Sequence, residues 1–314
     1  MELLERMADG RGGFVLFALT PPREAASPQR VAEIAEATIK RLSSVELDGV
    51  ILYDITDESD RNPDERPFPF LPTRDPATYL QEHFLTWPTP AIVYRAVGKY
   101  SEDQLRSWLS AQDTDRVLSV FVGASSRGRE TAISLARAYS LRNEVRPDLV
   151  LGGVAIPERH MRRRDEHLRL IAKQEAGCSF FVTQVIFDAN AAKNMISDYR
   201  HECRARGLPL VPIVFTFSVV GSLTTLEFLR WLGVEVPHWV ERDLTDSATP
   251  LQISHDHALA VAADLVNYCR RMDVPFGINV ESVSARRDEI EMSVKLAGQI
   301  AAVCGENVRP FDGA

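Results

Sequence analysis

Eight short apolar runs, spread along the whole chain, constrain the fold more than any other feature of the sequence. Their hydrophobicity is continuous rather than alternating, which is typical of strands buried on both faces in a parallel sheet. Segments with helical periodicity lie between them, so strand and helix alternate along the chain. The predicted strands are 13–19, 49–55, 90–95, 116–122, 148–155, 179–184, 209–216 and 275–280, and the predicted helices are 29–43, 102–111, 128–142, 163–176, 188–206, 222–232, 251–271 and 286–304.

Eight such units in 314 residues predict one TIM-type (β/α)8 barrel that spans residues 1–314 as a single domain. A doubly wound open sheet would usually carry a GxGxxG turn after an early strand, and the sequence contains none. The irregular stretch 56–75 follows the second predicted strand, and we expect it to be a long active-site loop. Active sites of such barrels lie at the carboxyl ends of the strands.

The composition argues against several classes of protein. The formal net charge of −8 argues against nucleic-acid binding, which needs clustered basic residues, so a small-molecule ligand is expected. The first residues, MELLERMADGRGG, show neither a signal peptide nor a spanning stretch, which predicts a cytoplasmic protein without membrane contacts. The four cysteines form no CxxC pair and are expected to be reduced. The HDH at 255–257 places its histidines on different helix faces, so no metal site is predicted.

Several motifs in the chain are shared with one enzyme family. The stretch LGGVAIPERH, followed by EHLRLIAKQEAGCSFFVTQVIFD, resembles the VAxYPExHP motif, the D-x6-K-x2-AGA helix end and the ITQxFFD strand of methylenetetrahydrofolate reductases. Supporting matches occur in the family's order: PPR after the first strand, RLSS before the second, VPI at 211–213 and VEVPHWV at 234–240. The resemblance implies a TIM-type barrel that reduces 5,10-methylenetetrahydrofolate to 5-methyltetrahydrofolate with electrons from a nicotinamide, in one-carbon metabolism and methionine biosynthesis.

The resemblance also implies candidate binding residues. Gln184 falls on the glutamine that hydrogen-bonds the folate pterin, and its amide offers donors and an acceptor to a pterin edge. The alternative is a strand-end amide that bonds neighbouring backbone. Thr183 beside it, and Tyr94 at the end of the third strand, are further candidates for substrate binding. Lys173 falls on a lysine that touches the phosphate or ribose region of the flavin, although a helix lysine often belongs to a solvated face.

The chain departs from the family at positions that serve the flavin and the proton transfer. The strand-one motif FEFFPP reads FALTPP here, so Ala18 replaces the glutamate that acts as general acid. Ala124 replaces an aspartate near the flavin, while Tyr94 and Tyr53 replace a histidine and a threonine. These changes put FAD binding in doubt. NADH or NADPH can transfer hydride directly to a folate iminium, since flavin is a relay, and the sequence does not decide between the two donors.

A carboxylic acid elsewhere must replace the missing glutamate if the reaction is kept. Asp54 is our first candidate, because it ends the second strand beside the first and a strand end is held rigidly. Glu58 lies on the loop above it, and Glu281, after the eighth strand, is the second candidate. The alternative is that the acidic stretch 54–66 is a solvated loop or a set of helix caps.

The stretch GASSRGRE at 123–130 joins the fourth strand to a predicted helix and is a candidate anion site. Backbone N–H groups at a helix N-terminus, with an arginine nearby, could bind the pyrophosphate of the nicotinamide cofactor or the glutamate carboxylates of folate. The serines are equally suited to capping the helix. The candidate cofactor-binding residues in this stretch are Ser125, Ser126 and Arg127.

Three functions are compatible with these residues. The first is flavin-independent reduction of methylenetetrahydrofolate by NADH or NADPH. The second is a conventional FAD-dependent reductase whose flavin contacts are rearranged. The third is a catalytically inactive folate-binding sensor or carrier, because a decayed enzyme would also lose two motif acids. The oligomeric state stays open at this point.

Overall fold

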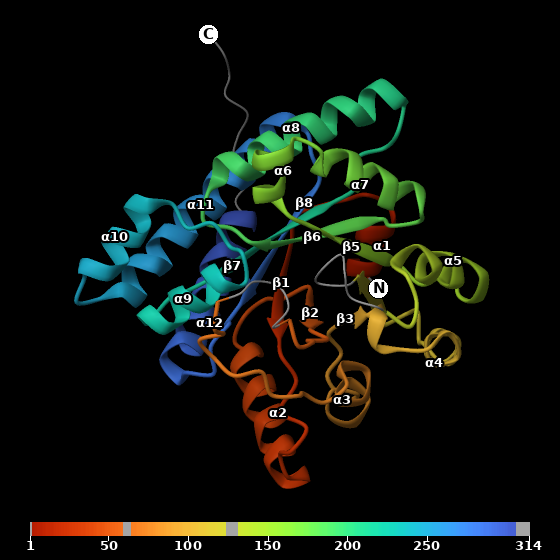
Figure 1. Ribbon diagram of the computed structural model, residues 1–314, viewed down its shortest axis with the longest axis horizontal. Coiled ribbons are helices and arrows are strands. Elements are labelled where there is room, and N and C mark those ends of the chain that lie inside the picture. Colours follow the sequence, from red (N-terminus) through yellow and green to blue (C-terminus); the bar gives the residue numbers. More distant parts are fainter. Residues whose placement is uncertain (1, 59–63, 124–130, 306–314) are drawn as a thin grey trace.

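The eight predicted strands form a closed parallel barrel (Figure 1). The computed structural model describes residues 2–58, 64–123 and 131–305. The strands pair in chain order and β8 closes on β1, so the prediction of a single-domain TIM-type barrel is confirmed. The strands are β1 (Phe14–Leu19), β2 (Gly49–Leu52), β3 (Ala91–Ala96), β4 (Val117–Val122), β5 (Leu151–Ala155), β6 (Phe180–Val185), β7 (Ile213–Ser218) and β8 (Phe276–Glu281).

Helices surround the barrel and cover its outer face (Figure 1). The predicted helices are present, and four short ones, α1, α3, α6 and α10, were not predicted. The described helices are α1 (Glu2–Ala8), α2 (Pro28–Leu42), α3 (Pro76–His83), the 3-10 turn η1 (Val97–Lys99), α4 (Glu102–Ser110), α5 (Leu135–Val145), α6 (Pro157–Arg163), α7 (Glu166–Glu175), α8 (Ala189–Arg206), α9 (Leu223–Trp231), α10 (His238–Asp246), α11 (Pro250–Met272) and α12 (Arg287–Gly305).

The helix predicted at 128–142 begins later than expected. Residues 131–134 are not helical, and α5 begins at Leu135, because the side chain of Ser134 accepts a hydrogen bond from the backbone N–H of Arg137 and caps the helix there. Residues 124–130 lie outside the described part of the chain. The anion site predicted on them therefore stays a prediction.

Alternate residues of each strand point into the barrel. On β1 these are Phe14, Leu16 and Ala18, which pack with inward side chains of the other strands. The register places Ala18 beside Glu281 of β8, and Glu281 beside Ser218 of β7. Since paired residues of neighbouring parallel strands point to the same face, these three side chains meet at one level near the carboxyl ends of the strands.

Helix α1 closes the amino-terminal end of the barrel. Its side chains Leu3, Leu4 and Met7 are buried in the same cluster as Phe14 and Leu16, the first inward residues of β1. Apolar packing therefore fills that end. The carboxyl end is the one that a ligand can approach, as is usual for this fold.

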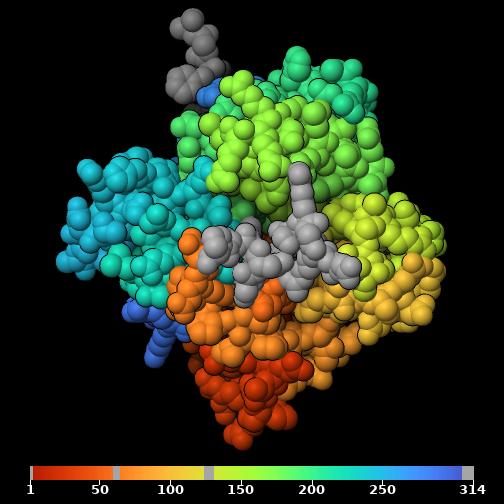
Figure 2. All heavy atoms as spheres, in the orientation of Figure 1, coloured from red at the N-terminus to blue at the C-terminus, as the bar shows by residue number. Residues whose placement is uncertain are grey.

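The described part of the stretch 56–75 is anchored to α9. The guanidinium of Arg66 lies 5.1 to 5.5 Å from the ring centres of Phe70, Phe228 and Trp231. The indole N–H of Trp231 donates to the backbone oxygen of Asp64 at 2.9 Å. Figure 2 shows this segment, in orange, directly against α9, in teal. Its role as an active-site loop stays a prediction.

All four cysteines are free thiols, as expected from their spacing. Among the described helices, none is both long and apolar enough to cross a membrane.

Candidate active site

The centre of the site is Glu281, the last residue of β8. Its side chain points into the barrel, only 9% of the residue is exposed, and the hydroxyl of Tyr53 donates to its Oε2. Burial raises the pKa of Glu281 to about 7, against the opposing effect of the hydrogen bond from Tyr53. A carboxyl group with this pKa carries a proton in a large share of molecules at neutral pH, as a general acid requires.

A layer of polar side chains lies just below and beside this carboxyl. The amide nitrogen of Asn279 donates to the hydroxyl of Tyr53 at 3.3 Å and to Oγ1 of Thr216 at 3.2 Å. The amide oxygen of Asn279 and the hydroxyl of Ser218 are buried and have no hydrogen-bond partner in the described structure. Buried polar atoms are rarely left unsatisfied, so these two mark a place where a water or ligand atom would fit.

Two tyrosine rings line the wall beside Glu281. The rings of Tyr53 and Tyr94 meet edge to face, with centres 4.9 Å apart. Burial raises the pKa of both hydroxyls, and the charge of Glu281 raises it further, so both stay neutral donors. Tyr94, expected as a substrate contact, thus lies in the barrel interior within reach of the same space.

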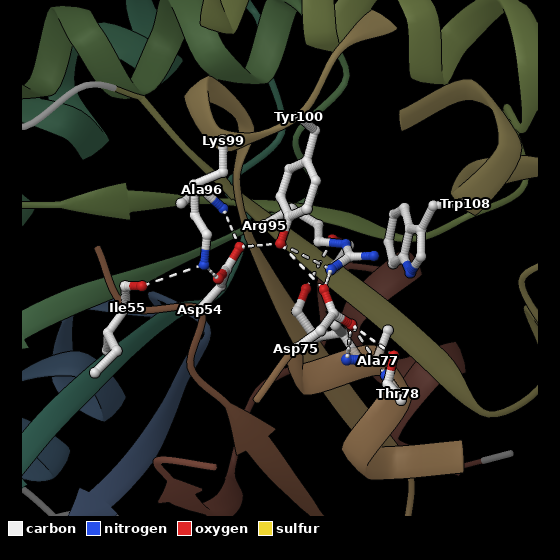
Figure 3. A network of polar contacts seen from close by, with 12 residues as sticks. Asp54, Ile55, Asp75, Ala77, Thr78, Arg95, Ala96, Lys99, Tyr100 and Trp108 are labelled. Carbon is white, nitrogen blue, oxygen red and sulfur yellow. Dashed lines mark hydrogen bonds and ion pairs between the residues drawn. The ribbon is translucent and has the colours of Figure 1, made fainter. Parts of the chain in front are cut away.

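Asp54 does not reach this site. Its carboxylate accepts hydrogen bonds from the backbone N–H of Ala96 at 2.9 Å, the hydroxyl of Tyr100 at 2.7 Å and the ammonium of Lys99 at 2.5 Å (Figure 3). These partners lie at the end of β3 and on the turn that follows it. Successive residues of an extended strand point to opposite faces, so Tyr53 points inward and Asp54 outward. The expectation that Asp54 approaches the space beside Ala18 is therefore wrong.

The network around Asp54 fastens strands to helices. Arg95 of β3 lies between the rings of Tyr100 and Trp108, 4.6 and 4.5 Å from their centres. It also pairs with the carboxylate of Asp75, which caps α3 by accepting from two backbone N–H groups (Figure 3). The network therefore joins the segment after β2 and the end of β3 to α3 and α4.

We expect Asp54→Asn to keep the turnover of the wild-type protein within roughly twofold, because the partners of the buried Asp54 carboxylate are Ala96, Lys99 and Tyr100 and none of them contacts Glu281 in the described structure. The measurement is the steady-state rate of NADH or NADPH oxidation with methylenetetrahydrofolate. A loss of a hundredfold or more in kcat, with an intact fold by circular dichroism, would restore Asp54 as the proton donor.

Gln184 lies in an irregular part of β6. The register with β7 shifts between Val182 and Val185, and such a bulge changes the direction of side chains near it. The amide nitrogen of Gln184 donates to the backbone oxygen of Leu232, at the end of α9, at 2.7 Å. Thr183 accepts a hydrogen bond at Oγ1 from the backbone N–H of Thr216, and 4% of the residue is exposed. Thr183 thus joins β6 to β7 and has little surface for a substrate.

The other candidates have different surroundings. Lys173 donates to the backbone oxygen of Val154 between α7 and β5, and burial lowers the pKa of its ammonium. Its side chain lies between α7 and the barrel and is largely removed from solvent, and its ammonium reaches the carboxyl-terminal part of β5. Glu58 lies on the described part of the loop, where its charge raises the pKa of Arg66 against the lowering effect of burial. Ser125, Ser126 and Arg127 lie outside the described residues.

No metal was predicted at 255–257, and those histidines have separate partners: His255 contacts Asp256 and Gln299, and His257 contacts the backbone oxygen of Phe187. Within the described ranges one other group could hold an ion, on the outer helices α6, α7 and α8, with ligand atoms within 4.8 Å of one another. One of its histidines already forms a hydrogen bond with its aspartate at 3.1 Å. The group consists of His160, His167 and Asp198.

Three polar residues of interest were not among the predicted site residues. Tyr53 and Asn279 complete the cluster around Glu281, and strand alternation places both on the face that carries Glu281. Glu158 begins α6 just after β5, and burial raises the pKa of its carboxyl to about 7. Its Oε2 is buried without a partner. Knowledge of which strand face points inward would have found the first two.

Comparisons with known proteins relate this site to a family. A solved structure of an uncharacterized protein from Clostridium thermocellum, described as binding two copies of 5-methyl-5,6,7,8-tetrahydrofolic acid, is 37% identical to this chain. The match covers 96% of this chain and 100% of the Clostridium chain, with a TM-score of 0.85. The family model for methylenetetrahydrofolate reductase matches residues 122–276. The chain belongs to the methylenetetrahydrofolate reductase family.

Other comparisons add only distant likeness. Dihydropteroate synthase of Xanthomonas albilineans is 12% identical, with 95% of this chain and 94% of that chain covered and a TM-score of 0.46. A psychrophilic family 10 endo-β-1,4-xylanase is 10% identical, with 95% and 99% covered and a TM-score of 0.49. A comparison with curated proteins finds no significant match.

The family's strand-one motif can be compared with the neighbouring residues Ala18 and Glu281. In that family's strand-one motif, the position of Ala18 carries the acidic residue. Here the neighbouring strand carries a buried glutamate at the same level of the barrel. An acid is therefore present beside the position where the family motif has one.

Proposed function

We propose that this chain reduces 5,10-methylenetetrahydrofolate to 5-methyltetrahydrofolate, with hydride delivered directly from NADH or NADPH and without a flavin. The observation that carries the proposal is the buried carboxyl of Glu281, whose pKa is raised to about 7, at the carboxyl end of a reductase-family barrel. The similar Clostridium protein binds 5-methyltetrahydrofolate, which is the product of this reaction.

Glu281 would supply the proton that the reaction needs. Protonation of N10 opens the methylene bridge and leaves an iminium at N5, and a hydride then adds to the exocyclic carbon of that iminium. The overall change consumes one proton and one dihydronicotinamide and forms the methyl group and the oxidised nicotinamide. Glu281 gives up its proton to N10 and regains one from solvent, so the carboxyl is restored after each turnover.

Two differences from the family's flavin-binding pattern support the flavin-free part of the proposal. The rings of Tyr53 and Tyr94 stand together in the barrel interior, at positions where the family has threonine and histidine. The aspartate near the flavin is replaced by Ala124, which lies outside the described residues. Since a dihydronicotinamide can reduce an iminium by itself, these losses remove no step that the chemistry requires.

A test of the proposal is an anaerobic assay that follows NADH and NADPH oxidation with methylenetetrahydrofolate and no added flavin. We expect turnover by a colourless protein that shows no flavin absorption. A yellow protein whose activity is lost when its flavin is removed would instead identify a conventional FAD-dependent reductase.

The second candidate function is that of a folate sensor or carrier without catalysis. One observation favours it: the description of the similar Clostridium protein mentions binding of a folate and no reaction. Tight binding of 5-methyltetrahydrofolate together with no oxidation of either nicotinamide would support this function and contradict the reductase.

A further inference from the structure

Glu281 is held by a contact that crosses a neighbouring strand. In barrel order β1 lies between β2 and β8. Tyr53 follows β2 and pairs with β1 through its backbone N–H, which donates to the oxygen of Leu19 at 3.0 Å. Glu281 lies on the other side of β1, in register with Ala18. The hydrogen bond from Tyr53 to Glu281 therefore passes over Ala18.

The small side chain at position 18 makes this contact possible. Alanine has only a methyl group, and it is 4% exposed, beneath the joined side chains of its two neighbours. A longer side chain at this position would project into the same space, since inward residues of neighbouring strands stand side by side. The loss of the family's acid at Ala18 and the bond between Tyr53 and Glu281 are thus two parts of one arrangement.

Asn279 sets the direction of the hydrogen bond. Its amide nitrogen donates to the oxygen of Tyr53, so the hydroxyl proton of Tyr53 is directed to Oε2 of Glu281. The ring of Tyr53 packs edge to face against the ring of Tyr94, and this contact helps to hold Tyr53 in position. No described residue donates to Oε1 of Glu281. That oxygen is left to carry the proton toward a ligand.

We propose that Tyr53 is a positioning residue that holds the Glu281 carboxyl over Ala18, so that the proton donor reaches N10 of the folate from strand eight in place of strand one. The proposal rests on the reductase function proposed above. It adds that Tyr53, which replaces the family's threonine, positions the carboxyl of Glu281. The ring of Tyr53 therefore does more than occupy space that a flavin would need.

The test compares Tyr53→Phe with the wild-type protein in kcat and in its pH dependence. We expect kcat to fall by roughly 10- to 100-fold, the usual effect of removing one hydrogen bond to a charged or reacting group. Since Tyr53 lowers the pKa of Glu281, its removal raises that pKa. The reaction needs the protonated acid, so the fall of kcat at alkaline pH should begin at a higher pH in the variant.

Tyr199→Phe is the matched control. Tyr199 is fully buried, and its hydroxyl donates to Gln174 at 2.7 Å, on helices outside the barrel. We expect this variant to keep the wild-type kcat and pH profile. If the wild-type protein turns over, and Tyr53→Phe keeps both its kcat and its alkaline limit, the positioning role is wrong. If the wild-type protein itself shows no turnover, the proposed function fails first.

Discussion

Replacing Glu281 by glutamine should lower kcat by about 100- to 10,000-fold, the range that a general acid contributes. Glutamine keeps the size of the side chain and can still accept the hydrogen bond from Tyr53, but it has no acidic proton to give to N10. Binding of 5-methyltetrahydrofolate, measured by calorimetry, should stay within roughly threefold of wild type, since the shape of the site is kept. Turnover at the wild-type rate would show that Glu281 is not the acid.

Asp54→Asn is the control for this prediction, because it makes a similar carboxylate-to-amide change just after another strand, β2. Returning the acid to strand one gives a complementary measurement. In the double variant Ala18→Glu with Glu281→Ala, the register places the new carboxyl beside the old position. We expect the double variant to be at least roughly tenfold faster than Glu281→Ala alone, because the acid again reaches the same space.

Replacing Asp75 by alanine should lower the free energy of unfolding by about 2–4 kcal/mol, because it leaves the buried guanidinium of Arg95 unpaired, while the Asp75 side chain itself is 33% exposed. The guanidinium of Arg95 would be left between Tyr100 and Trp108 without its carboxylate, with 6% of its side chain exposed. The cap of α3 would also be lost. The measurement is equilibrium unfolding in urea.

The pH dependence of the same pair has a definite sign. Burial raises the pKa of Asp75, but Arg95 and the hydrogen bonds outweigh burial and hold it below its usual value. Its contribution to stability is therefore present above the unfolded aspartate pKa of about 3.9 and is lost as the pH falls through the lowered value.

Glu291→Ala is the control for Asp75→Ala. It breaks the ion pair between Arg287 and Glu291, whose side chains are 83% and 52% exposed. We expect a loss of less than about 1 kcal/mol, as is typical of surface pairs. An equally small loss for Asp75→Ala would contradict the structural role of the buried network.

The two acid candidates show where prediction from sequence succeeds and fails. Asp54 was placed at the end of the second strand and Glu281 just after the eighth, whereas in the structure β2 ends at Leu52, two residues before Asp54, and Glu281 is the last residue of β8. Which of them faces inward was not readable, because a strand that is buried on both faces has no alternation of polar and apolar residues to reveal its phase. The side chain of Asp54 points to the outer face of the barrel, whereas that of Glu281 points to the interior.

The surroundings of Lys173 and Thr183 were not predicted, for a related reason. Motif similarity places each on a helix or strand, but the backbone contacts of their side chains depend on the neighbouring element. Gln184 is a mixed case. Its strand end was predicted, whereas the bulge that redirects it depends on the pairing of β6 with β7.

The sequence alone determined the eight strands, their order and the family, because continuous apolar runs and short motifs are local properties of the chain. Only the tertiary structure decided where the acid lies. Tyr53 and Glu281 are separated by 228 residues and meet because the sheet closes β8 onto β1. Closure sets the register, the register sets which side chains share a level, and that level brings a glutamate beside Ala18.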